Sequence, residues 1–459
     1  MRPFPLPSSL LLVAAASATL TLVGCAAIDP HDVLGRRVSH LEPPGEGPSA
    51  PLGEAGRRLA LEHVWTTVSQ RYYDPSLNGV DWAEARRRWE PEALRAPTDE
   101  AFWQALDRMT GELRDAHTRV ESPARAALRE RSESVGLGFG ARWLEGQLVV
   151  TSVRADSGAF FAGVRPGMAI VEVDGTPAGA AYARWLAEAR MTSTESARER
   201  VALRSLLAGE PGSRVRLLFE RPSGEQLEAT IPRERHRAPP RVTHRTLPSG
   251  FGYIRLSNWN TSLQGDMIAA ISALKESPGL IIDLRGNPGG ALNMVREVTA
   301  HLVEGRLDAG RAITRTGKPI TVAFDWVELI KLRQEIAGKG TYRGPIAILV
   351  NGESASASEF FSGVLQASKR ATVVGETTCG CLLAYLGYAN VPGGGRLAYS
   401  EVGFELTDGR RIEREGVVPD LAVPATVADL RTGRDRALEA AQRTLANQRS
   451  RTAQTAIGR

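Results

Sequence analysis

The sequence predicts a multidomain protein of mixed α/β class, and three observations support this prediction. Its 459 residues are enough for two or three domains. Hydrophobic residues make up 42% of the chain, which is sufficient to build several cores. Helical, strand-like and alternating strand–helix patterns follow one another, which indicates a helical N-terminal region, a β-rich domain and an α/β core in that order.

Residues 1–25 are expected to be a lipoprotein signal peptide. Arg2 precedes an apolar stretch, 10–23, that is too short to span a membrane. The chain then reads Leu-Val-Gly-Cys, which resembles a bacterial lipobox and implies lipidation of Cys25. The alternative is an ordinary secretory signal with a chance cysteine. Residues 26–27 are alanines, whereas an inner-membrane retention signal usually has aspartate there. This favours the periplasmic face of the outer membrane.

Residues 26–54 are rich in proline and glycine, which predicts a flexible tether. Residues 55–132 are expected to form a helical domain, because hydrophobic side chains recur there at helical spacing in two runs, and Thr98 is expected to cap the second. The two runs are Leu59, Val64, Trp65, Val68 and Tyr72, then Ala101, Phe102, Ala105, Leu106 and Met109.

Residues 133–235 switch to strand patterning, with a predicted strand at 147–153. A Gly-Leu-Gly-Phe-Gly motif begins this segment, and a Gly-Val-Arg-Pro-Gly-Met motif follows from Gly163. Together they resemble a PDZ domain of the bacterial protease type, although glycine-rich hairpin turns are the alternative. The resemblance implies that backbone amides of the first motif bind the terminal carboxylate of a peptide, beside an edge that accepts an added strand. These residues are Gly136, Leu137, Gly138 and Phe139. Residues 182–207 exceed a minimal PDZ helix and are interpreted as an insertion.

A basic linker, 235–240, leads into residues 236–430, where strands and helices alternate. The alternation predicts an α/β layer with a largely parallel sheet. The expected strands are 252–256, 280–284, 347–350 and 372–374, with helices between them. An amphipathic helix, 435–448, is expected within the C-terminal segment 431–459.

Composition excludes several kinds of partner. The net charge of +5 comes from scattered arginines, and no long basic block with interleaved aromatics is present, so nucleic acid is not expected to bind. Besides Cys25, only Cys379 and Cys381 occur, and no second ligand pair stands at zinc spacing. We expect no metal and no cofactor. The Cys-x-Cys pair is interpreted as free or idly bridged thiols; a redox switch or a metal clamp is the alternative.

Two turns carry the chemistry. Residues 354–359, Ser-Ala-Ser-Ala-Ser-Glu, lie between a predicted buried strand and a predicted helix, 359–369. A serine there sits over a helix N-terminus, where backbone amides and the helix dipole favour an oxyanion. A serine-rich helix cap is the alternative. A second turn, 283–290, reads Asp-Leu-Arg-Gly-Asn-Pro-Gly-Gly, and its glycines let amides approach a ligand closely.

These turns, with Val-Val-Gly-Glu-Thr at 373–377 and Gly-Val-Val-Pro-Asp at 416–420, occur in an order that resembles the C-terminal processing (tail-specific) serine peptidases. Tricorn-core and retinoid-binding-protein-like proteins are relatives of that family. The resemblance covers roughly residues 60–425 and implies a ClpP/crotonase-like α/β catalytic core that cleaves polypeptides. It also implies that Ser356 is the nucleophile. The implied oxyanion donors are the amides of Ala357, Gly289 and Gly290.

One position departs from the tail-specific branch. That branch uses a lysine base about 25 residues after the nucleophile, where this chain has Cys381. A histidine can act instead. Residues 113–119, Leu-Arg-Asp-Ala-His-Thr-Arg, resemble the histidine motif of the tricorn-like branch and imply that His117 is the base; a helix-capping histidine is the alternative. The same branch places a glutamate before Gly-Val-x-Pro-Asp, which implies Glu413, with Glu415 as the second choice. A surface ion pair is the alternative for that carboxylate. A serine precedes the histidine in the branch's archetype, but here that residue is Ala116.

The sequence therefore predicts a serine endopeptidase of Ser-His-Glu type, anchored by its lipid and acting on polypeptides through their C-termini. Two other interpretations stay open. One is an inactive PDZ lipoprotein scaffold, for which the missing lysine argues. The other is a carrier of apolar ligands, like the retinoid-binding relatives.

Overall fold

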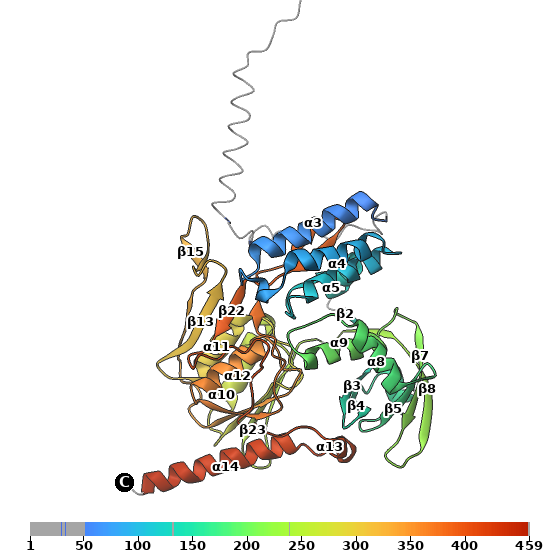
Figure 1. Ribbon diagram of the computed structural model, residues 1–459. Helices are drawn as coiled ribbons and strands as arrows, with labels where there is room; N and C mark the ends of the chain where they lie inside the picture. The colour runs from blue at the N-terminus through green and yellow to red at the C-terminus, as the bar shows by residue number, and fades with distance from the viewer. Residues whose placement is uncertain (1–28, 30–32, 34–50, 131–132, 238, 458–459) are drawn as a thin grey trace, which may run out of the picture.

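The computed structural model describes residues 29, 33, 51–130, 133–237 and 239–457. The predicted signal peptide with Cys25, and most of the predicted tether, lie outside the described residues. None of the helices in the described ranges is long and apolar enough to cross a membrane. In Figure 1 the N-terminal helices, in blue, lie above a green β-rich part and a yellow-to-orange α/β core; the C-terminal helix runs beneath the core, and the short helix that precedes it lies beneath the β-rich part.

The N-terminal region is helical, as the periodicity predicts. Thr98 caps its helix as expected, because its side chain accepts the Ala101 N–H. An arginine-rich helix, α4, was not predicted, because it buries few hydrophobic side chains. The elements are α3 (Glu54–Arg71), η1 (Leu77–Gly79), α4 (Trp82–Leu94), α5 (Asp99–Gly111), β1 (Arg119–Glu121) and α6 (Pro123–Glu130). Strand β1 pairs antiparallel with β21 (Gly395–Ala398), which fixes the loop between α5 and β1 against the core.

The β-rich part is an antiparallel sheet in the order β3-β4-β5-β7-β8. Its first strand, β3, lies at an edge. The predicted insertion forms helices α8 and α9. The expected linker from residue 235 begins instead as strand β9, which pairs antiparallel with β2. The bounds are β2 (Glu133–Gly136), β3 (Phe139–Leu144), β4 (Gln147–Val153), α7 (Gly158–Phe161), β5 (Ala169–Val173), β6 (Thr176–Pro177), α8 (Ala178–Glu188), α9 (Glu195–Leu207), β7 (Arg214–Glu220), β8 (Gln226–Pro232) and β9 (Glu234–Arg237).

The core contains a sheet in the order β10-β11-β12-β17-β18-β23, in which every pair except β10–β11 is parallel. The four predicted strands are confirmed to within a residue. Helices α10, α11 and α12 cover one face, and α14 packs on the other. The bounds are β10 (Val242–Thr246), β11 (Gly252–Leu256), η2 (Thr261–Leu263), α10 (Gln264–Ala273), β12 (Leu280–Asp283), α11 (Leu292–Leu302), β17 (Ile346–Val350), α12 (Ala357–Ala367), β18 (Ala371–Gly375), β23 (Leu421–Ala422), α13 (Val427–Thr432) and α14 (Arg436–Ile457).

The expectation of helices between all these strands is wrong for the segment between α11 and β17. This segment forms strands: buried and more exposed side chains alternate along β16, and β13 pairs with β16 on one side and with β22 on the other. A second sheet has the order β16-β13-β22-β19, and β14 pairs with β15 in a hairpin. The bounds are β13 (Arg306–Thr314), β14 (Ile320–Val322), β15 (Val327–Ile330), β16 (Arg333–Ala337), β19 (Leu383–Ala384), β20 (Ala389–Val391), β21 (Gly395–Ala398) and β22 (Val402–Glu405).

Candidate active site

The serine turn joins the buried strand β17 to helix α12. Ser356 is the N-cap of α12 and has φ 54° and ψ −115°. A positive φ is unfavourable for a residue with a side chain and costs about 1–3 kcal/mol. The surrounding structure therefore holds this residue in place. Its N–H donates to Glu359 Oε2 at 2.8 Å.

The glycine turn after β12 lies directly against the serine turn, as the sequence predicts. Asn287 O accepts the Ala355 N–H at 3.1 Å. A Cβ on Gly289 would lie 2.7 Å from Ser356 Cβ, and one on Gly290 would lie 2.4 Å from the carbonyl oxygen of Trp259, so only glycine fits at either position.

Of the predicted oxyanion donors, the Gly289 amide is already in use. It donates to Asn287 Oδ1, in the same turn, at 3.0 Å. This geometry corrects the prediction for Gly289, whose amide is directed within its own turn. The amides of Gly290 and Ala357 remain as candidates.

The structure brings His117 to the serine. His117 Nε2 lies 3.2 Å from Ser356 Oγ, although the residues are 239 positions apart. Asp115 fixes the loop that carries the histidine. One carboxylate oxygen accepts the His117 N–H at 2.7 Å, and the other accepts the hydroxyls of Thr118 at 2.5 Å and Ser400 at 2.6 Å.

The environment of His117 favours a neutral ring. Burial lowers its pKa to about 4; the Asp115 carboxylate opposes this shift, and the Arg119 guanidinium adds to it. The ring is therefore neutral near pH 7 and can accept a proton from a hydroxyl at hydrogen-bond distance.

The predicted third member, Glu413, is half-buried with both carboxylate oxygens enclosed, but it is not hydrogen-bonded to His117. Within the described part of the chain, neither Glu413 carboxylate oxygen nor His117 Nδ1 has a hydrogen-bond partner. Burial raises the pKa of Glu413 well above its ordinary value, the Asp115 charge raises it further, and a polar contact with Ser193 opposes the shift. The predicted direct contact is thus not made. Glu415, the second choice, is exposed.

The predicted insertion reaches the site, which the sequence did not indicate. Ser193 Oγ accepts the Ala116 N–H at 2.9 Å, next to the histidine. Arg190 Nη2 donates to Thr118 O at 2.7 Å, and Thr194 Oγ1 donates to Cys379 O at 2.8 Å. Segment 190–194 therefore contacts both the histidine loop and the loop after β18. Only the unusual length of the insertion marked it in advance.

Glu359 is a second residue whose role the sequence did not reveal, although it lies within the serine motif. Its side chain is fully buried. Its carboxylate accepts the Thr378 hydroxyl at 2.6 Å and the N–H groups of Gly380 at 2.7 Å and Cys381 at 3.0 Å, besides that of Ser356. Burial raises its pKa to about 7, and these hydrogen bonds oppose that shift.

The predicted carboxylate-binding loop lies between β2 and β3. Gly138 has φ +79°, and its carbonyl accepts the Arg154 N–H at 2.8 Å. A Cβ there would lie 2.1 Å from Ser157 Cβ, so the turn requires glycine. Leu137 is buried, and Phe139 begins the edge strand β3.

The described residues contain no group of three or more histidine, cysteine, aspartate or glutamate side chains that could hold a metal ion. The residues brought together here are a hydroxyl beside a neutral imidazole, over a helix N-terminus and a glycine turn. Such an arrangement is typical of acyl transfer.

Comparisons with known proteins agree with this geometry. Residues 250–423 match peptidase family S41, and residues 54–111 match the tricorn protease C1 domain. The carboxyl-terminal-processing protease of Synechocystis sp. is 27% identical over 393 residues, which cover 83% of each chain. The chloroplastic C-terminal processing peptidase of Tetradesmus obliquus is 26% identical and covers 81% of this chain and 78% of its own.

Solved structures show the same fold. The photosystem II D1 C-terminal processing protease superposes with a TM-score of 0.53 at 25% identity, covering 80% of this chain and 93% of its own. Mature CPAF superposes with a TM-score of 0.64 at 18% identity, covering 87% and 98%. The chain therefore contains a peptidase family S41 domain and a tricorn protease C1 domain, and over most of its length it is similar to carboxyl-terminal-processing proteases.

Proposed function

We propose that this peptidase cleaves polypeptides through an acyl-enzyme on Ser356, with His117 rather than a lysine as the base. The observation that carries the proposal is the 3.2 Å distance between His117 Nε2 and Ser356 Oγ. The lysine position of the tail-specific branch holds Cys381, and Lys369 lies beyond the opposite end of α12 from the serine.

In the proposed reaction, His117 Nε2 takes the hydroxyl proton as Ser356 Oγ attacks a peptide carbonyl. The N–H groups of Ala357 and Gly290 stabilise the oxyanion, and α12 contributes its positive N-terminal dipole. The protonated imidazole then gives its proton to the leaving amine. Water attacks the acyl-enzyme with His117 again as the base, which releases the second product and restores the serine.

Glu413 is proposed as the third group, acting on His117 through ordered water. Three buried polar atoms without partners, two on Glu413 and one on His117, are unusual together, and ordered water commonly satisfies such atoms. Ser193 supports this role, because its hydroxyl accepts the Ala116 N–H and its presence opposes the rise in the pKa of Glu413. In this proposal Ser193 supplies from the insertion the serine that is missing at Ala116.

Replacing Glu413 by glutamine is expected to lower kcat roughly tenfold to hundredfold with little change in KM, because the amide cannot stabilise the imidazolium. Glu415→Gln, at an exposed position, serves as the matched control and should keep wild-type kcat. Equal kcat values for the two variants would exclude Glu413 as the third group.

Stability provides a separate readout for the same variant. The folded-state pKa of Glu413 lies above the unfolded value of 4.5, so the folded protein binds this proton more tightly and loses stability as the pH rises through and above that value. Glu413→Gln removes this loss. The melting temperature of the variant should therefore gain relative to wild type as the pH rises above 4.5.

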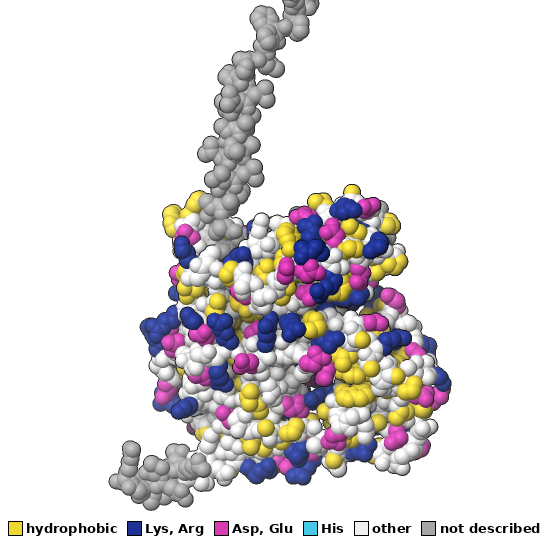
Figure 2. Space-filling view, in the orientation of Figure 1, with side chains coloured by type: hydrophobic (Ala, Val, Ile, Leu, Met, Phe, Trp, Pro, Cys, Tyr) yellow, Lys and Arg dark blue, Asp and Glu magenta, His cyan; other side chains and the backbone are white. Residues whose placement is uncertain are grey.

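The β-rich part is proposed to be a PDZ domain that binds or gates substrate C-termini. Its edge strand β3 offers unpaired backbone groups beside the Gly136–Phe139 loop, where a peptide strand can add. Trp143 on β3 stacks on Tyr182 of α8, with ring centroids 4.9 Å apart, and Figure 2 shows hydrophobic side chains gathered over this part.

We further propose that the peptidase is an exported lipoprotein, anchored through Cys25 on the periplasmic face of the envelope. The signal sequence and the bacterial and chloroplast relatives support an exported or lumenal location. The family assignment favours a peptidase over the inactive scaffold and the apolar-ligand carrier.

The proposed mechanism is tested by labelling the folded protein with a fluorophosphonate probe and mapping the adduct by mass spectrometry. The adduct is expected on the peptide that carries Ser356, in parallel with loss of casein hydrolysis. Hydrolysis that persists after complete labelling, or a probe adduct on another residue, would contradict the mechanism.

A further inference from the structure

Cys379 and Cys381 form a disulfide beside the candidate active site. Both side chains are buried, with 7% and 2% exposure. The disulfide packs with Ala197 of α9 and against Ala116 and Ala355, which directly precede the base and the nucleophile. The bridge therefore lies between the two chain segments that carry the reacting groups.

The backbone of this loop holds the serine through one carboxylate. The amides of Gly380 and Cys381 donate to Glu359, and Glu359 Oε2 accepts the Ser356 N–H. The Cys379 N–H also donates to Ser354 O at 3.0 Å. Because Ser356 has an unfavourable positive φ, its position depends on such contacts.

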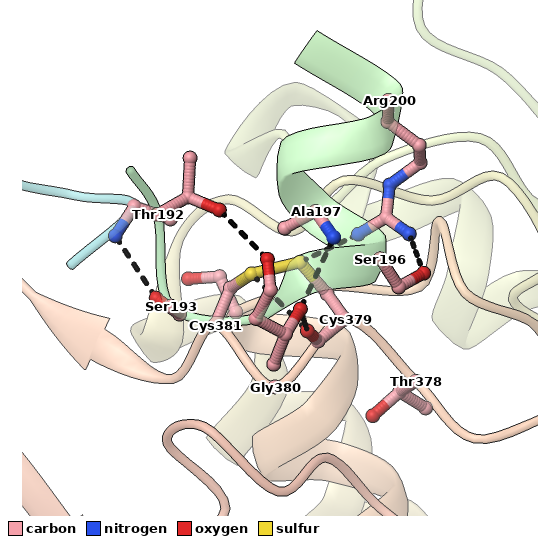
Figure 3. The surroundings of a disulfide bond; sticks show 12 residues. Thr192, Ser193, Ser196, Ala197, Arg200, Thr378, Cys379, Gly380 and Cys381 are labelled. Atoms are coloured by element: carbon pink, nitrogen blue, oxygen red, sulfur yellow. Dashed lines mark hydrogen bonds between the residues drawn. A yellow bond between two sulfur atoms is a disulfide. The ribbon is translucent and has the colours of Figure 1, made fainter. Parts of the chain in front are cut away.

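Helix α9 covers the bridge from the β-rich part. In Figure 3, Arg200 reaches down from α9 to the sulfur atoms, and the 192–193 segment lies beside Cys381. Arg200 Nη2 lies 3.0 Å from Cys379 Sγ. A guanidinium at that distance stabilises a thiolate, so Cys379 is the better leaving group of the pair.

We propose that Cys379–Cys381 is a thiol–disulfide exchange site whose closed form holds Ser356 in its reactive geometry and whose reduction by a dithiol slows acylation of Ser356. The proposal rests on the proposed function, because it assigns a control to the same serine. It also gives a role to the two cysteines, where the sequence alone favoured free or idly bridged thiols.

The exchange with the dithiol proceeds in two steps. A thiolate of the dithiol attacks Cys381 Sγ, the S–S bond breaks, and Cys379 leaves as a thiolate facing Arg200. The second thiol of the reductant then attacks the mixed disulfide and releases Cys381. The protein gains two electrons and two protons, and the dithiol becomes a disulfide.

Opening the ring is expected to affect catalysis through the backbone. The closed ring of three residues restricts the dihedral angles that aim the Gly380 and Cys381 amides at Glu359. Once the ring is open, these donors are no longer fixed, and a fully buried carboxylate with fewer donors binds a proton more readily. A protonated Glu359 is a weaker acceptor for the Ser356 N–H, so the serine is less well positioned.

The experiment compares oxidised full-length protein with the same protein treated with dithiothreitol. The readout is the rate of fluorophosphonate labelling at Ser356, and alkylation with peptide mapping verifies the thiol state of Cys379 and Cys381 separately from Cys25. Reduction is expected to slow labelling about tenfold to hundredfold, the size of effect caused by small misplacement of a reacting group. Reoxidation should restore the original rate.

The double variant Cys379→Ser, Cys381→Ser provides the matched control. It is expected to label at the slow rate with or without dithiol, and circular dichroism checks that it is folded. Equal rates for reduced and oxidised wild type, or a bridge that stays closed in dithiol while the chain remains folded, would overturn the exchange site alone. Failure to label Ser356 in either state would overturn the proposed function as well.

Discussion

Replacing Ser356 by alanine is expected to lower kcat/KM for polypeptide cleavage by roughly 10⁴-fold or more, since the acyl-enzyme can no longer form. The fold should be kept, because alanine removes only the hydroxyl, while the backbone N–H of residue 356 still donates to Glu359. The measurement is the rate of casein or peptide hydrolysis at substrate concentrations below KM. Loss of fluorophosphonate labelling is measured alongside it.

Two variants make this result specific. Ser362→Ala removes a hydroxyl on the same helix that donates only to helix carbonyls, and activity should remain at the wild-type level. Ser356→Gly is expected to be as inactive as Ser356→Ala and at least as resistant to thermal unfolding, because glycine adopts a positive φ without strain. Substantial hydrolysis by either Ser356 variant would show that another residue is the nucleophile.

Replacing His117 by alanine is expected to lower kcat by roughly 10³-fold or more, because Ser356 then has no base within reach. KM should change little, since the imidazole acts mainly in the transition state. His63→Ala, in helix α3, is the matched control and should retain wild-type kcat. Wild-type activity in His117→Ala would show that another residue is the base.

The pH profile tests the same histidine in the wild-type protein. Because the pKa of His117 is lowered to about 4, the ring stays neutral and able to accept a proton down to that pH. Activity should therefore be lost completely only below about pH 4. A partial decline is expected as the pH falls through about 7, where Glu359 is half-protonated and the protonated form accepts the Ser356 N–H less strongly. A single complete loss centred at the ordinary histidine value of about 6.5 would contradict a buried base.

Much of this architecture could be predicted from local pattern. Apolar runs located the four central strands of the parallel sheet, because strands buried on both faces show as continuous hydrophobic segments. The serine and glycine turns were found because both follow such strands. Their apposition followed from family resemblance, and the close packing of Gly289 on Ser356 explains why that glycine is needed.

Other features depend on contacts between segments far apart in sequence. Arginine-rich α4 buries few hydrophobic side chains. Strand β13 pairs with β16 across the β14–β15 hairpin and with β22 much later in the chain, which a local pattern does not show. The spacing of Glu413 from the Gly-Val-Val-Pro-Asp motif at 416–420 favoured it over Glu415. That spacing could not reveal that the Glu413 carboxylate makes no direct hydrogen bond to His117. The contacts of Ser193 and Arg200 arise only when an insertion folds onto the core.

The docking of segment 190–200 limits how this enzyme can be recombined with its relatives. Its β-rich part cannot be exchanged as an independent cassette, because a foreign replacement would arrive without the side chains that contact the Ala116 amide and the Cys379 carbonyl. A chimera that retains these residues and changes only the edge strand β3, the proposed peptide-binding edge, would keep the contacts made by segment 190–194 at the histidine loop and at the loop after β18. In the proposed function, such a chimera changes the peptide that is recognised while the surroundings of His117 and Ser356 stay the same.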